Sequence, residues 1–240
     1  MIELLKNKKV IFFDVGYTLD YPLSGDWMFT NKFYELVDDR LNRYSPDEIQ
    51  RAKNKGLEYL EKNHLVQTAE DEYYQFIHFY SEISRNLSLD LTEVEIKEIA
   101  FDRTYNMDNY IVYPDVKKVL KVLSKVYKLG IISDTWPSIE RQLCSIGVAE
   151  FFSIHTYSCF LGTFKPDERM YKDALDKCGV LAKDTVFVDD SLNNLEGAEK
   201  LGITPILIAA NPASDVDSPY LKIHSLTELL NESICMKKKL

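Results

Sequence analysis

The 240-residue chain lacks the features typical of secreted, zinc-binding and membrane-spanning proteins. It has only four cysteines (144, 159, 178 and 235), with no CxxC pair and no zinc-like spacing. Three of them lie in apolar surroundings and are expected to be small core residues. No apolar run approaches 18 residues, and no hydrophobic segment precedes a small-residue cleavage site near the N-terminus. We therefore expect a cytoplasmic protein from a reducing compartment.

Positive charge is also in short supply. The chain has 29 Lys and Arg residues against 38 Asp and Glu residues, which gives a net charge of -9. Such a surface repels phosphate backbones and anionic lipids, so neither a nucleic acid nor a membrane is expected as a partner. The one basic cluster, residues 236–240, is expected to be a solvated tail. The expected partner is a small molecule, and the expected assembly is a monomer or homodimer.

Two hydrophobic patterns divide the chain. Residues 25–106 have the spacing of helices with no strand between them, and one helix start is marked by a capping Ser45 followed by Pro46. Elsewhere apolar strands alternate with helices, which predicts βαβ units. Strands are expected at 9–14, 129–133, 152–157, 185–189, 204–209 and 221–224. Helices are expected between them, at 116–126, 139–146, 168–178, 195–201 and 226–230.

The predicted fold class is therefore α/β. It is a Rossmann-like, mostly parallel sheet with helices on both faces, plus an inserted all-helical cap. We expect residues 1–20 and 108–240 to form the core domain, and residues 21–107 to form the cap domain over the carboxyl ends of the strands.

Polar residues stand where the predicted strands end. The first strand ends in Asp14, the second ends in Ser133 and Asp134, and Lys165 lies in the loop after the third. Asp189 and Asp190 end the fourth. The carboxyl ends of parallel strands share one edge of the sheet, so these side chains are expected to meet there.

Each of these residues also has a simpler interpretation. Asp14 and the pair Asp189-Asp190 could cap helices, Ser133 could belong to a turn, and Lys165 could lie in a surface loop. Together those interpretations are strained, because neighbouring carboxylates repel one another unless a positive group lies nearby. Mg²⁺ is such a group, since it prefers oxygen ligands and binds one or two carboxylates together with a phosphate.

The order Asp14-x-x-x-Thr18, Ser133, Lys165 and Asp189-Asp190 resembles the four motifs of the haloacid dehalogenase (HAD) superfamily of aspartate-nucleophile hydrolases. The resemblance covers nearly the whole chain, and the helical block resembles the small cap of the family's first cap class. It implies a Mg²⁺-dependent hydrolase, in the leading interpretation a phosphatase of a small phosphorylated metabolite.

The resemblance also implies roles for individual residues. Asp14 would be the nucleophile and form an aspartyl-phosphate. Asp14, the backbone carbonyl of Gly16 and Asp190 would bind Mg²⁺, with Asp189 as a second ligand or an outer-shell group. Ser133 would bind the phosphoryl oxygens, and Lys165 would neutralise their charge together with that of the nucleophile. Thr18 of the first motif would contact the substrate. We also expect Asp134 in the substrate site, although the family more often has Asn or Gly after this Ser.

Gly16 departs from the family pattern. Phosphatases of the family usually have a second Asp at this position, which protonates the leaving alcohol and then activates water. Loss of such a group typically slows a reaction by about 10²–10⁴-fold. The family's dehalogenase and phosphonate-cleaving branches lack that Asp too, but Asp189 and Asp190 favour a retained metal.

Several explanations of Gly16 remain open. The substrate could have a good leaving group, Asp134 could replace the missing acid, or the protein could cleave a phosphonate or a haloacid. A phosphonate-cleaving enzyme would use a cap lysine. A catalytically weak, ligand- or protein-binding module is a further alternative. If only the missing acid limits the rate, Gly16→Asp should raise the hydrolysis of alkyl phosphates.

Aromatic residues concentrate in one predicted cap helix, between Tyr73 and Tyr80. We expect this stripe to be core rather than a substrate-stacking surface. Trp27 and Trp136 lie near the predicted hinge and sheet edge, where either could line the substrate pocket. The four histidines are scattered and predict no ligand set.

Overall fold

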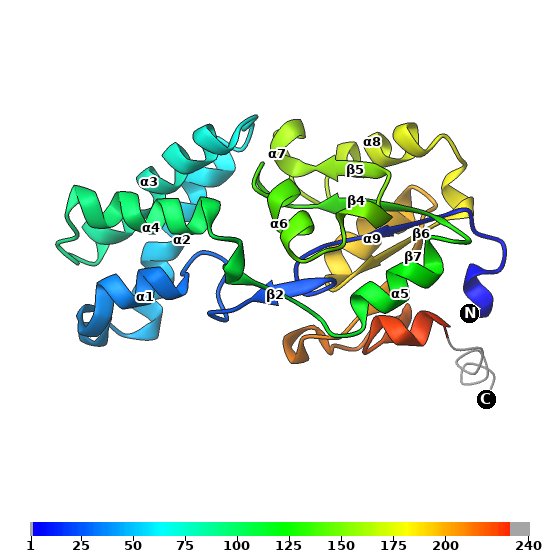
Figure 1. Ribbon diagram of the computed structural model, residues 1–240, viewed down its shortest axis with the longest axis horizontal. Helices are drawn as coiled ribbons and strands as arrows, with labels where there is room; N and C mark the ends of the chain where they lie inside the picture. Colours follow the sequence, from blue (N-terminus) through cyan, green and yellow to red (C-terminus); the bar gives the residue numbers. More distant parts are fainter. Residues whose placement is uncertain (1, 231–240) are drawn as a thin grey trace.

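The computed structural model describes residues 2–230, so the basic cluster at 236–240 and Cys235 lie outside the described residues. A six-stranded sheet in the order β5-β4-β1-β6-β7-β8 forms the centre of the core, and every neighbouring pair is parallel (Figure 1). Its strands are β1 (Val10–Phe13), β4 (Lys128–Ser133), β5 (Ile154–Tyr157), β6 (Thr185–Asp189), β7 (Thr204–Ile208) and β8 (Leu221–Ile223). The parallel Rossmann-like sheet predicted from the sequence is confirmed.

Helices cover both faces of the sheet, which explains why β1 is buried along its whole length. Alternate side chains of β1 enter different cores: Ile11 and Phe13 pack on one face, Val10 and Phe12 on the other. The first core is shared with α5 (Val116–Leu123) and α6 (Ile139–Ser145), and the second with α8 (Glu168–Cys178) and α9 (Leu192–Lys200). The short helix α7 (Ser158–Leu161) follows β5 directly.

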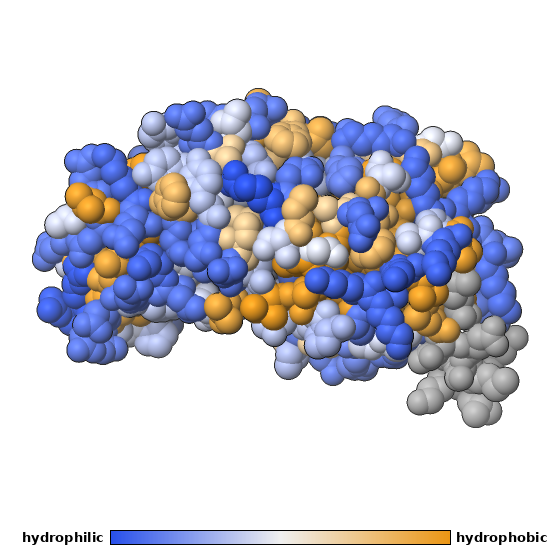
Figure 2. All heavy atoms as spheres, in the orientation of Figure 1, coloured by the Kyte–Doolittle hydropathy of each residue, from blue (hydrophilic) through white to orange (hydrophobic). Residues whose placement is uncertain are grey.

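The inserted helices form a second lobe beside the core (Figure 1). They are α1 (Asn31–Val37), α2 (Pro46–Lys62), α3 (Ala69–Asn86) and α4 (Glu93–Tyr105). A hydroxyl-bearing N-cap begins each of them, and α2, α3 and α4 have full capping boxes. Phe76, Phe79 and Tyr80 of α3 are buried in the cap's core, as expected of the aromatic stripe, whereas Tyr73 is only partly buried and Tyr74 is exposed. Hydrophilic side chains cover most of the visible face of both lobes (Figure 2).

Two short strands join the lobes, β2 (Asp20–Pro22) and β3 (Tyr110–Val112), which pair antiparallel. The pattern of the sequence gives no sign of β2, because three residues ending in a proline carry too little alternation. Helix α9 begins three residues before its expected start. Cys159 and Cys178 are buried, whereas Cys144 is exposed, so only two of the three cysteines expected in the core lie there within residues 2–230.

Within residues 2–230, no helix combines the length and the apolar character needed to cross a lipid bilayer.

Candidate active site

Most of the sequence-predicted residues line one cavity of about 270 Å³ at the carboxyl ends of β1, β4 and β6, but Thr18 and Asp189 do not. Because Phe13 pairs with Ile131 on one side and with Val188 on the other, Asp14 lies level with the ends of both neighbouring strands. The core lines the cavity with Asp14, Gly16, Ser133, Asp134, Lys165 and Asp190 among others, and the segment that leads into and out of the cap adds Trp27, Met28, Arg103 and Tyr110.

Lys165 joins the carboxyl ends of three strands, β1, β4 and β6. Its ammonium donates to Asp14 Oδ1 at 2.6 Å, to Asp189 Oδ2 at 2.8 Å and to the backbone oxygen of Ile132 at 3.2 Å. The Lys165 side chain is 1% exposed, so these bonds form away from water and are stronger than surface ion pairs. These bonds hold the loop that contains Lys165 next to Asp14.

Burial and charge act in opposite directions on this pair. Burial raises the pKa of Asp14 well above its usual range; the ammonium of Lys165 lowers that pKa, and Asp189 and Asp190 raise it further. Burial alone would lower the pKa of Lys165, but the carboxylates of Asp14 and Asp189 outweigh it and raise the pKa. Lys165 therefore stays protonated, and one more positive group beside Asp14 would favour the ionised carboxylate.

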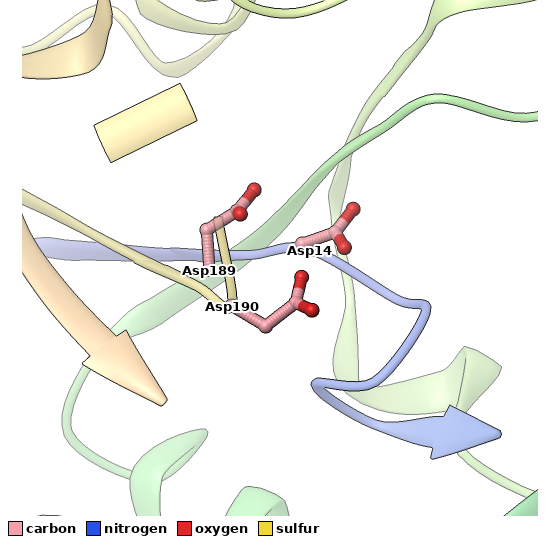
Figure 3. Close-up of side chains that lie close together, drawn as sticks. All are labelled: Asp14, Asp189 and Asp190. Carbon is pink, nitrogen blue, oxygen red and sulfur yellow. The ribbon is translucent and has the colours of Figure 1, made fainter. Parts of the chain in front are cut away.

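Asp14, Asp189 and Asp190 gather three carboxylates within the reach of one metal ion. One oxygen from each lies within 4.8 Å of the others. Figure 3 shows the Asp14 and Asp190 side chains next to each other, with Asp189 to their left on the same strand end as Asp190. Their mutual repulsion and the raised pKa of Asp190, to about 6 through burial and then Asp189, indicate a site short of positive charge.

Asp189 and Asp190 differ in how their oxygens are used. Asp189 is fully buried and accepts from Lys165, from the Ser191 amide at 2.8 Å and from Asn194 at 3.1 and 3.2 Å. Asp190 lines the cavity, and the side-chain hydrogen bond that it accepts within residues 2–230 is from Ser214 Oγ to Oδ2 at 2.8 Å. Among these residues its Oδ1 has no side-chain partner and is available to a cation, whereas both Asp189 oxygens are occupied. The donor set of Asp14 and Asp190 fits a hard cation such as Mg²⁺.

The space that a side chain at position 16 would need is already filled. A Cβ atom built on Gly16 would lie 2.9 Å from Cζ2 of Trp27. The indole also packs against Tyr17 and Tyr110, which hold it in place. The expectation that Gly16→Asp would simply supply a missing acid overlooks this contact, because the new carboxylate would collide with the ring.

The remaining predicted residues separate into two that line the cavity and one that does not. Ser133 and Asp134 both line it, and Asp134 Oδ1 accepts from the Lys165 amide at 2.9 Å. Burial within the site raises the pKa of Asp134, and Lys165 partly counteracts the shift. Thr18 is fully buried and is absent from the cavity lining, so the structure does not place it where the expected substrate contact requires. Its amide donates to the Val15 oxygen within the turn after β1.

Arg103 and Gln142 line the cavity without having been predicted. Arg103 looks like an ordinary surface residue of a polar helix in the sequence, and nothing in the local pattern shows that the end of α4 turns inward. Trp27 and Trp136 line the cavity as the sequence suggested for either of them. The histidines form no ligand set among the described residues.

The sequence comparisons agree with this geometry. Residues 9–202 match the model of a hydrolase family described as haloacid dehalogenase-like hydrolase. The glyceraldehyde 3-phosphate phosphatase of Pyrococcus furiosus is 25% identical over 237 residues, which cover 94% of this chain and 91% of that protein. The uncharacterized protein YMR130W of Saccharomyces cerevisiae is 35% identical over 129 residues, 45% of this chain and 42% of that protein. Several matches to curated relatives span about half of the relative's length.

Solved structures share the fold as well. A HAD phosphatase from Thermococcus onnurineus superposes with a TM-score of 0.63 at 23% identity, over 92% of this chain and 95% of that one. A 2-haloacid dehalogenase from Pseudomonas syringae superposes with a TM-score of 0.61 at 20% identity, over 93% and 96% of the two chains. With the family match over most of its length and the sheet-edge cluster of Asp14, Lys165, Asp189 and Asp190, the chain belongs to the haloacid dehalogenase-like hydrolases.

Proposed function

We propose that the protein is a Mg²⁺-dependent phosphatase that hydrolyses a small phosphorylated metabolite through an aspartyl-phosphate on Asp14. The observation that carries the proposal is the buried ammonium of Lys165, which bonds to Asp14 and Asp189 beside the free oxygen of Asp190. The full-length similarity to a protein named as a glyceraldehyde 3-phosphate phosphatase supports a small phosphate ester as substrate.

The residues present fit a magnesium ion. Asp14, Asp190 and the backbone carbonyl of Gly16 would hold it, and Asp189 would stay an outer-shell group because Lys165, Ser191 and Asn194 occupy its oxygens. Bound there, the ion would supply positive charge against the phosphoryl oxygens.

The chain's own groups then position the reaction. Lys165 holds Asp14 Oδ1, which leaves the other carboxylate oxygen to attack phosphorus as the bond to the leaving oxygen breaks. Lys165 and the hydroxyl of Ser133 neutralise and orient the phosphoryl oxygens. Water then attacks the phosphorus of the aspartyl-phosphate, which releases phosphate and restores Asp14. Phosphoryl transfer depends chiefly on such positioning and charge stabilisation.

Asp134 is our proposed source of the proton for the leaving oxygen. It lines the cavity, its raised pKa suits an acid, and the Lys165 amide fixes its orientation. Asp134→Asn should therefore lower kcat for alkyl phosphates by about 10-fold or more without weakening Mg²⁺ binding. Steady-state kinetics with ethyl phosphate, together with a magnesium titration, measure both effects. An unchanged kcat would remove Asp134 from the mechanism.

The central test is phosphate release from a metabolite panel, with and without Mg²⁺, by the wild type and Asp14→Asn. We expect turnover to need Mg²⁺ and to fall in the variant by at least about 10³-fold, since the nucleophile is lost. Turnover that survives in Asp14→Asn would overturn the proposed mechanism. Halide release from haloacids that ignores a chelator would favour a dehalogenase, and ligand binding without any turnover would favour a binding module.

A further inference from the structure

Arg103, near the end of α4, brings a second cation into the cavity that contains Lys165. Its guanidinium is nearly fully buried and is held from three sides. Nε donates to the Trp27 backbone oxygen at 2.8 Å, Nη1 donates to Tyr110 Oη at 2.8 Å, and the group lies 4.6 Å from the centre of the Phe76 ring. Such a group is fixed in one orientation and loses little further freedom on binding a ligand.

Burial would lower the pKa of Arg103, but Tyr110 and the carboxylate of Glu72 outweigh it and raise the pKa, so the guanidinium is charged. Glu72 lies 3.8 Å from Nη1, and it accepts from the amide and the hydroxyl of Ser138, both at 2.7 Å. The Nη2 atom of Arg103 has no hydrogen-bond acceptor among residues 2–230, and it is not one of the atoms closed off from solvent. This donor is therefore open to a ligand in the cavity.

The position of Arg103 relative to the reaction centre is set through Trp27. The Trp27 oxygen accepts from Arg103, while its indole lies against Gly16, two residues after the nucleophile. The phosphoryl group would lie at Asp14 and Lys165, so the part of the substrate beyond it would extend toward Trp27 and Arg103. The same cavity of about 270 Å³ contains Asp14, Lys165 and Arg103, so one small substrate can reach all three.

We propose that Arg103 is a specificity-determining residue that binds the carboxylate of a short phosphorylated carboxylic acid. The inference rests on the proposed phosphatase function and adds the substrate class. A planar guanidinium pairs with the two oxygens of a carboxylate, and the unused Nη2 supplies a donor for that pair. A carboxylate is also the smallest organic anion that presents two acceptor oxygens to such a group.

The experiment compares matched esters with and without a carboxylate, 2-phosphoglycolate and ethyl phosphate, in the wild type and in Arg103→Gln. We expect the ratio of their kcat/KM values to favour phosphoglycolate in the wild type and to fall by about 10- to 100-fold in the variant. Arg103→Lys keeps the positive charge but lacks the planar pair of N–H donors, so its ratio should lie between those of Arg103→Gln and the wild type. A ratio that Arg103→Gln leaves unchanged, or a wild-type preference for a bisphosphate such as ethylene glycol bisphosphate, would overturn the assignment.

Arg141→Gln is the matched control. Arg141 also joins the core to the cap, through a bond to the Thr104 oxygen at 2.9 Å, but it does not line the cavity. Its loss should leave the ratio as in the wild type. A similar fall in both arginine variants would assign Arg103 a merely structural role.

Binding separates failure of this inference from failure of the proposed function. Calorimetry with phosphoglycolate on Asp14→Asn should show affinity that the further change Arg103→Gln lowers by about 10-fold or more. That result would support the carboxylate site even if no ester were hydrolysed. If Asp14→Asn and the double variant bound phosphoglycolate with equal affinity, the carboxylate site would be ruled out even if the phosphatase activity were confirmed.

Discussion

A side chain at position 16 and the indole of Trp27 would occupy the same space in the cavity. The close approach of the indole to the Gly16 Cα explains why this position tolerates no side chain while Trp27 keeps its place. The absence of a side chain at position 16 and the position of the Trp27 ring are therefore linked, because each requires the other. Beside Asp14, an apolar ring fills the space that a side chain at position 16 would need.

At this scale we predict that Gly16→Asp alone lowers activity and stability, because its Cβ lies 2.9 Å from the Trp27 ring. The double variant Gly16→Asp/Trp27→Ala has room for the carboxylate. It should hydrolyse ethyl phosphate about 10-fold faster or more than Trp27→Ala, by protonating the leaving alkoxide. Parallel assays with p-nitrophenyl phosphate, whose leaving group needs no proton, give the control. A gain from Gly16→Asp alone would contradict this steric argument.

The sequence predicts the residues of the core half of the site better than those of the cap half. Asp14, Ser133 and Asp190 are recognisable because each follows a buried strand whose end the parallel topology fixes. The ionic bonds of Lys165 and the inward position of Arg103 depend on how loops and helices far apart in the sequence meet. Such tertiary contacts cannot be predicted from the local sequence pattern.

At the scale of elements, the cap depends on close packing between α2 and α3. Gly56 lies in the middle of α2, and a Cβ there would lie 2.6 Å from Cδ2 of Phe79, which is fully buried in α3. The glycine thus permits the two helices to approach each other at this point. The helices themselves are predictable from their capping boxes and spacing, whereas this contact is not.

Gly56→Ala should therefore destabilise the protein by about 1–2 kcal/mol, although alanine is the better helix former. Urea unfolding measures the change. In the background of Phe79→Leu, which removes the ring, the same substitution should be neutral or stabilising, and the double-mutant cycle gives the coupling. A stabilising Gly56→Ala in the wild-type background would show that the helices can shift to admit a methyl group.

At the scale of the whole molecule, three cap residues bind the core beside the cavity. Glu72 accepts from Ser138, Gln75 accepts from the Trp136 indole at 3.1 Å, and His64 bonds to Ser158 Oγ at 2.6 Å. These contacts place the cap over the carboxyl ends of the strands, as the insertion in the sequence led us to expect. The domain boundaries at 20/21 and 107/108 remain a prediction. The first falls within β2, where the chain already crosses between the lobes.

His64 makes this contact sensitive to acid. The hydroxyl of Ser158 donates its proton to the Thr135 backbone oxygen. The proton in the bond between His64 and Ser158 therefore belongs to His64 Nε2, which donates to Ser158 Oγ. The other ring nitrogen, Nδ1, is buried and has no hydrogen-bond partner within residues 2–230. Burial lowers the pKa of His64 from 6.5 to about 4. The folded protein thus keeps His64 neutral at pH values where the unfolded chain has bound a proton.

The contribution of His64 to the free energy of unfolding should consequently be fully present above pH 6.5 and fall as the pH drops towards 4, by about 3 kcal/mol. Buried carboxyls with raised pKa values, such as Asp20 at about 7, change the stability in the opposite direction over this range. His64→Gln keeps a donor for Ser158 and removes the titration, so the free energy of unfolding of the wild type relative to His64→Gln should fall by about this amount between pH 6.5 and 4. Urea unfolding at half-unit pH steps measures both slopes, and His78→Gln, at an exposed histidine, shows what losing a histidine does in general. Identical slopes for the wild type and His64→Gln would mean that protonated His64 is accommodated in the fold, for instance by separation of the cap from the core.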